Sequence, residues 1–237
     1  MTFMRSQMSK DFRFQPVYSA PQTRLLVARL VSYWRYSFAS YDTDALVLRN
    51  PQPLYERYRD VNVIAGASVH WPQWAGELWG FSMCLGAFMI RSSPETEQLW
   101  KAVSKTWGNW GSEQDQFNRA LVGSNIAWNH TRSNMTKSQF CQHPYAWEGF
   151  TQKEPRSHIL LLPPRQFCRG ECCDKTEYPL SHSPFIFHGG GGNIGMFAGK
   201  KLHMKESGVW FLREDWAQVS QFSEKTERHW LKQLSTL

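Results

Sequence analysis

Two carboxylates one residue apart, in Asp42-Thr43-Asp44, are the clearest sign of chemistry in the 237-residue sequence. They follow the run Tyr36–Tyr41, which predicts a strand. Residues i and i+2 of an extended segment project to the same side, so both carboxylates could face one divalent cation. Mg²⁺ and Mn²⁺ take oxygen ligands and keep open positions for substrate phosphates. The pattern therefore suggests a metal and diphosphate site, although Asp is also favoured in turns.

A second candidate is His188, which is the last residue of a predicted strand over residues 184–188 and precedes four glycines. We favour a phosphate-binding loop, in which backbone N–H groups around Gly192 approach phosphate oxygens and Lys200 or Lys201 adds positive charge. A dinucleotide-binding glycine motif, an esterase oxyanion loop and a flexible loop beside a buried histidine are the alternatives. Too few residues follow for a dinucleotide domain. The candidate nucleophile at Ser82 lies on the wrong side of the glycines for an esterase.

A third group opens a predicted helix over residues 113–121, where Glu113 and Asp115 lie two residues apart. Acidic residues there also suit the helix macrodipole, which is reason enough for their presence. A functional role for Asp115 or its neighbour Gln116 requires contact with a sugar or an acceptor hydroxyl.

Aromatic residues are abundant, with 12 Trp and 15 Phe. Three of the tryptophans, Trp71, Trp74 and Trp79, fall in a segment without clear periodicity. They are either core residues or the lining of a cleft that stacks sugars.

The elements that must position these residues alternate between strand and helix, which predicts an α/β domain with a mainly parallel sheet. Ligands of such sheets bind beyond the carboxyl ends of the strands, where Asp42, Asp44 and His188 would meet. Residues 1–22 read as an N-terminal arm and residues 23–237 as a single domain. Strands are predicted at 36–41, 60–66, 83–90, 159–162 and 184–188, helices at 23–34, 95–106, 113–121 and from 214 onward, and irregular structure at 71–79 and 124–157.

The net charge of +7 comes from scattered Lys and Arg residues, so it argues against nucleic acid and suits a small anionic substrate. The chain shows neither an apolar run of membrane-span length nor a signal peptide pattern.

Five cysteines leave the disulfide pairing open, and a zinc site formed by Cys168, Cys172, Cys173 and His182 is the competing interpretation. Two glycosylation sequons, at Asn129 and Asn134, favour passage through the secretory lumen.

Taken in order, these motifs resemble the nucleotide-diphospho-sugar transferase family, glycosyltransferases of the GT-A fold, with GT77-like members as the nearest type. The resembling blocks are residues 40–51, 85–92, 114–118, 161–170 and 188–210. The resemblance implies a mainly parallel, mixed sheet flanked by helices. Only about 35 residues precede the strand that leads to Asp42, so we expect the N-terminal nucleotide-binding strands to be shortened or missing.

The resemblance also implies residue roles. Asp42, Asp44 and His188 would bind Mn²⁺ or Mg²⁺, with Asp42 also reaching the nucleotide. Gly192 and Lys200 would contact the donor diphosphate. Asp115 and Gln116 would lie near the reacting sugar as catalytic candidates.

The function that this implies is a metal-dependent glycosyltransferase of the Golgi lumen. It would move a sugar from a nucleotide-sugar donor, such as a UDP-sugar, to a glycan or glycoprotein acceptor. A non-catalytic carbohydrate-binding or interaction protein on a degenerate transferase fold is the alternative.

Overall fold

The computed structural model describes residues 33–42, 44–69, 71–106, 112–132, 135–169 and 184–189, together with Cys172, Leu202, Met204 and Lys205. The predicted arm of residues 1–22, nearly all of the predicted helix 23–34 and the predicted helix after residue 214 lie outside this part. No helix within it combines the length and apolar character that a membrane span needs.

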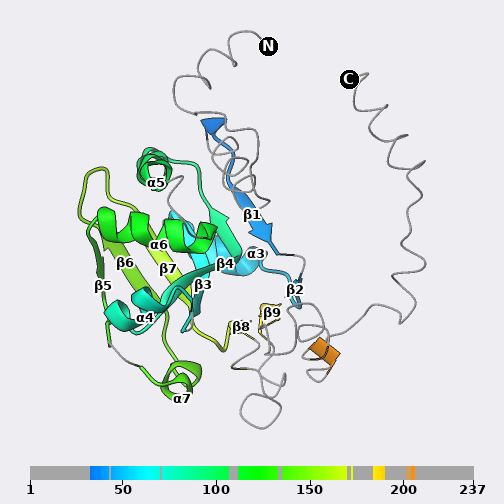
Figure 1. Ribbon diagram of the computed structural model, residues 1–237. Coiled ribbons are helices and arrows are strands. Elements are labelled where there is room, and N and C mark those ends of the chain that lie inside the picture. The colour runs from blue at the N-terminus through cyan, green and yellow to red at the C-terminus, as the bar shows by residue number, and fades with distance from the viewer. Residues whose placement is uncertain are drawn as a thin grey trace, which may run out of the picture.

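A six-stranded sheet forms the centre of the described structure (Figure 1). Its strand order is β1 (Phe38–Tyr41), β4 (Ser82–Ile90), β3 (Val63–Ser68), β7 (His158–Leu162), β6 (Trp147–Thr151) and β5 (Ile126–Trp128). Only β3 and β7 pair in parallel, and the other pairs of this sheet are antiparallel. The α/β class and the mixed sheet are confirmed, but antiparallel pairs outnumber the parallel ones that we expected to prevail.

A smaller sheet lies beside the large one. It contains β2 (Ala45–Val47), β9 (Ile186–His188) and β8 (Phe167–Arg169), in that order. β2 runs antiparallel to β9, and β8 runs parallel to it. Asp42 follows β1 of the large sheet and Asp44 precedes β2 of the small sheet, so both residues lie at the junction between the two.

Five helices surround these sheets in the described residues. They are α3 (Gln52–Arg57), α4 (Gln73–Trp79), α5 (Pro94–Lys105), α6 (Glu113–Gly123) and α7 (Lys137–Cys141). The α5 helix begins as its sequence predicts, because the Ser93 hydroxyl accepts the Thr96 N–H at 3.2 Å and Pro94 occupies the first turn.

Side chains alternate between the two faces of the sheet with the period of a strand. Val63 and Ala65 of β3 pack with Trp100 of α5 and Phe117 of α6, whereas Ile64 packs on the other face. Figure 1 shows α4, α5 and α6 together on the first face. The second face is covered by α3 and the small sheet.

Two segments differ from the sequence prediction. Residues 71–79 are not irregular, since α4 forms there and ends at Gly80, whose φ of 88° is left-handed. Residues 124–157 contain β5, α7 and β6. The short length of these elements hides their periodicity, although the capping box of Thr136 and Gln139 marks the start of α7.

The zinc hypothesis is wrong. Cys172 forms a disulfide with Cys141, and Cys168 is disulfide-bonded as well, so neither offers a thiolate to a metal. This disulfide ties α7 to the segment after β8.

The amino-terminal half of β4 extends beyond the end of β1, and α6 supplies the missing neighbour. The Asn118 amide accepts the Met83 N–H and donates to the Met83 carbonyl, both at 2.9 Å. Two residues on, the Leu85 N–H donates to the Gln114 side-chain oxygen at 3.3 Å. Side-chain amides of α6 thus form the hydrogen bonds that a neighbouring strand would make with this edge of β4, and they hold α6 against the strand.

Candidate metal site at the junction of the two sheets

The two carboxylates of the Asp-x-Asp motif converge through a turn. Asp42 follows β1 and Asp44 precedes β2, and the Ala45 N–H donates to the Asp42 carbonyl at 2.9 Å, which closes a four-residue turn. The sequence argument placed both acids on one side of an extended segment, so the expected convergence has a different cause. The turn belongs to the junction between the sheets.

His188 reaches the same place from the small sheet. It ends β9, where it pairs with Ala45, and the next N–H, that of Gly189, donates to the Asp44 carbonyl at 3.0 Å. The His188 Nε2 lies 3.5 Å from an Asp42 oxygen and 3.4 Å from an Asp44 oxygen. One ligand atom from each of the three residues lies within 4.8 Å of the others.

A bulge in β4 makes room for the imidazole. Pairing with β3 jumps from Phe88 to Cys84, which leaves the three residues between them outside the ladder. Gly86 is the middle one, and its carbonyl accepts the Asp42 N–H at 2.6 Å. A Cβ on Gly86 would lie 2.0 Å from the His188 ring, so the ring occupies space that only glycine leaves open. Bulges are common next to active sites, where they redirect a side chain or end strand pairing.

Charge accumulates around the imidazole. Burial lowers the pKa of His188, but electrostatic interaction with Cys84, whose Sγ lies 3.6 Å from Nδ1, and hydrogen bonds with Asp42, Asp44 and Cys84 outweigh this effect and raise the pKa to about 11. The two carboxylates thus create a small, mostly buried negative site, which favours a positive charge within it.

The donor set fits a hard divalent cation. Two carboxylates and one imidazole are a donor set that can hold a divalent metal ion. Neighbouring ligands held at 2.0–2.1 Å from an ion lie about 3 Å apart. The separations from the His188 Nε2 to the two carboxylates, 3.4 and 3.5 Å, are a few tenths of an ångström longer than this, and all three ligand atoms lie within 4.8 Å of one another.

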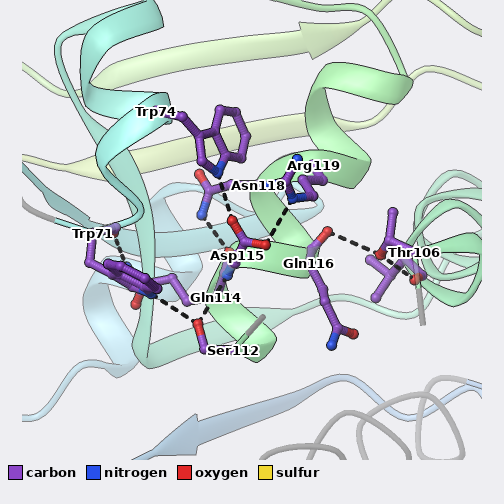
Figure 2. A network of polar contacts seen from close by, with 10 residues as sticks. Trp71, Trp74, Thr106, Ser112, Gln114, Asp115, Gln116, Asn118 and Arg119 are labelled. Carbon is purple, nitrogen blue, oxygen red and sulfur yellow. Dashed lines mark hydrogen bonds and ion pairs between the residues drawn. The ribbon is translucent and has the colours of Figure 1, made fainter. Parts of the chain in front are cut away.

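Asp115 and Gln116 lie at the start of α6, in a separate polar cluster (Figure 2). Asp115 is 5% exposed, and its carboxylate accepts the Trp74 indole N–H at 2.6 Å and the Arg119 Nε–H at 2.8 Å. The Gln116 carbonyl accepts the Thr106 hydroxyl at 3.4 Å, and its side chain points away from the Asp115 carboxylate.

The cluster and the metal site share β4. The Gln114 side-chain oxygen accepts the Leu85 N–H, and the adjacent Gly86 leaves the space that the His188 ring occupies. Consecutive Cα atoms are about 3.8 Å apart, so the two groups of candidates contact neighbouring points on one strand.

The structure therefore brings Asp42, Asp44 and His188 together. Gly192 and Lys200, predicted to bind the diphosphate, lie outside the described residues. Sequence reasoning gave no role to Cys84, which orients the imidazole. A lone glycine within a buried strand pattern was the available signal for the close approach at Gly86.

An α/β domain with a mixed sheet and an Asp-x-Asp turn at a strand end defines a GT-A-like domain. The profile of the nucleotide-diphospho-sugar transferase family matches residues 7–188, and the chain belongs to this family. The match includes the three candidate ligands and α6, and Gly192 and Lys200 lie beyond it. Searches of curated proteins and of solved structures found no match.

Proposed function

We propose that the protein is a metal-dependent glycosyltransferase that moves a sugar from a nucleoside-diphosphate sugar to a hydroxyl of a glycan or glycoprotein. The observation that carries this proposal is the cluster of Asp42, Asp44 and His188. Family membership supports transfer from a nucleotide sugar, and the donor set supports dependence on Mn²⁺ or Mg²⁺.

Each residue of the cluster has a distinct part in the proposal. Asp44, with a side chain 13% exposed, is the inner carboxylate and the principal cation ligand, while Asp42 at 35% is open enough to meet the nucleotide as well. His188 contributes its Nε2. A bound cation supplies charge neutralisation to a diphosphate leaving group. Lys200 and Gly192 would complete the contacts to phosphate.

The contacts of Asp115 favour a positioning role. Both of its oxygens are engaged, one by Trp74 and one by Arg119, so proton transfer would require a break in this arrangement. We propose that Asp115 holds these side chains against the acceptor.

We further propose that the protein works in the lumen of the secretory pathway, in the Golgi. The Cys141–Cys172 disulfide is typical of an oxidising compartment. The first residue of the Asn129 sequon is exposed, as a glycosylation acceptor must be.

Calorimetric titration of the protein with UDP in the presence of Mn²⁺ tests the proposal. We expect binding that EDTA abolishes. Asp44→Asn keeps the side-chain volume but removes a charged ligand, so it should weaken binding by about 100-fold or more, beyond the 10–100-fold typical of residues that only support a ligand. Glu154→Gln is the matched control, because Glu154 is a 72% exposed acid that forms a surface ion pair with Arg156.

Equal binding of UDP and Mn²⁺ by the wild type and Asp44→Asn would overturn the metal assignment. Release of UDP from UDP-sugars is the complementary measurement. A protein that binds oligosaccharides but releases no UDP from any UDP-sugar would instead be the non-catalytic carbohydrate-binding alternative.

A further inference from the structure

A pocket of about 380 Å³ opens beside α4 and the start of α6. Its volume is at the small end of the range for ligand sites. The residues that line it are Trp71, Pro72, Gln73, Trp74, Glu77, Asp115 and Arg119. Two indoles and four polar side chains thus surround one space.

Trp71 is exposed and yet rigidly held. The residue is 53% exposed, while its indole N–H donates to the Ser112 hydroxyl at 3.0 Å. Its carbonyl accepts the Ser82 hydroxyl at 2.5 Å and the Gln114 amide. Figure 2 shows the Trp71 indole bonded to Ser112 near the start of α6. Holding a large aromatic group at both ends in advance lowers the entropic cost of binding something flat against it.

The polar wall of the pocket is equally fixed. Asp115 accepts hydrogen bonds from the Trp74 indole and from the Nε of Arg119, and the guanidinium lies 5.1 Å from the Trp74 ring centroid. Arg119 is 51% exposed, and no hydrogen bond or ion pair in the described part of the chain uses its two terminal nitrogens. Across the pocket, the Gln73 amide donates to Glu77 at 2.9 Å.

We propose that this pocket binds a pyranose unit of the acceptor glycan. A pyranose ring has an apolar C–H face, which would lie on the indole of Trp71, and a rim of hydroxyls that both donate and accept. Arg119 offers donors to that rim, Glu77 offers acceptors and Gln73 offers both. The pairing of one apolar surface with several polar groups is the pattern of a small-molecule site.

Charge argues against the donor as the occupant. The pocket contains the carboxylates of Asp115 and Glu77 and one guanidinium, that of Arg119. A diphosphate would meet net negative charge there, whereas a neutral sugar would not.

Gln114, next to Asp115 in the chain, connects the wall of the pocket to β4, the strand that passes the candidate metal site. The Gln114 amide donates to the Trp71 carbonyl, and its oxygen accepts the Leu85 N–H. Gly86, which follows Leu85, leaves the space that the His188 ring occupies. This connection through Gln114 and β4 is the reason to assign the pocket to the acceptor. The assignment as an acceptor site rests on the proposed function, but the binding of carbohydrate does not.

The experiment is calorimetric titration of the full chain, without nucleotide or metal, with three tetrasaccharides of β-1,4-linked glucose, xylose and galactose. We expect at least one to bind. Trp71→Ala should weaken that binding by about tenfold or more, as loss of an aromatic anchor does, and Trp71→Phe should restore most of it. Tyr145→Ala is the control, because Tyr145 is an aromatic residue, 68% exposed, that does not line the pocket.

Titration of the same variants with UDP and Mn²⁺ separates this inference from the proposed function. Unchanged nucleotide binding by Trp71→Ala, with lost sugar binding, supports the acceptor pocket. Equal tetrasaccharide binding by the wild type and Trp71→Ala, or no binding of any of the three, overturns it. Sugar binding without UDP binding would refute the transferase proposal and leave the carbohydrate site in place.

Discussion

Replacement of Gly86 by alanine should disable the candidate metal site without touching a ligand. The new Cβ would lie 2.0 Å from Cε1 and 2.3 Å from Nδ1 of His188. Ordinary contact begins at 3.4 Å, so the ring must retreat by about 1.4 Å. Metal ligands tolerate displacements of about 0.2 Å.

The expected loss follows from this displacement. His188 is 6% exposed, so the ring cannot turn aside at no cost, and the unfolding free energy should fall by about 1–3 kcal/mol through overpacking. Because the imidazole no longer points correctly at the cation, Mn²⁺ affinity should fall by about 10–100-fold.

Electron paramagnetic resonance of unbound Mn²⁺ measures the affinity, and urea unfolding measures the stability. Gly123→Ala is the matched control, since a Cβ there meets nothing within 4 Å and the residue ends α6. It should leave Mn²⁺ affinity unchanged and alter stability by about 1 kcal/mol at most. If Gly86→Ala binds Mn²⁺ as tightly as the wild type, His188 is not a ligand and the reasoning fails.

Three further predictions concern stability and modification. Asn118→Asp should destabilise the fold by about 1–3 kcal/mol, because the buried Met83 carbonyl and the partly buried Gln114 carbonyl each lose a donor; urea unfolding measures this loss, and an unchanged midpoint would refute the strand-like role of the amide. Burial lowers the pKa of His158 below its ordinary 6.5, so the folded state resists protonation of this residue. The contribution of neutral His158 to the unfolding free energy should therefore be fully present above pH 6.5 and be lost as the pH falls below it. His158→Gln should reduce this pH dependence, as measured by unfolding between about pH 7.5 and 5. Secreted protein should carry a glycan at Asn129 that Asn129→Gln removes, as followed by mass spectrometry after glycosidase treatment, and an unmodified Asn129 would contradict the proposed lumenal location.

The buried strands and the capped helices could be predicted from the sequence. The run from Met83 to Ile90 is apolar at nearly every position because β4 is covered on both faces. The start of α5 at Ser93 and Pro94 was recognisable for an equally local reason. The relative direction of paired strands could not be predicted from local sequence, because it depends on the path of the chain between them. Antiparallel pairs therefore prevailed against our expectation.

The same distinction holds in the candidate site. Residue types and order predicted that Asp42, Asp44 and His188 would meet, and they do. The turn that brings the two acids together and the bulge that admits the imidazole are not evident from those residues alone. Both depend on the meeting of two sheets, which is a tertiary property.

The carboxamides that line the amino-terminal half of β4 have one more consequence. A strand whose N–H and C=O groups lack a neighbour can recruit a strand from another molecule, and natural proteins cover such edges. Asn118 and Gln114 occupy the groups of Met83 and Leu85 that such a strand would use. These two amides therefore occupy the backbone groups through which this part of β4 could pair with a strand of another molecule.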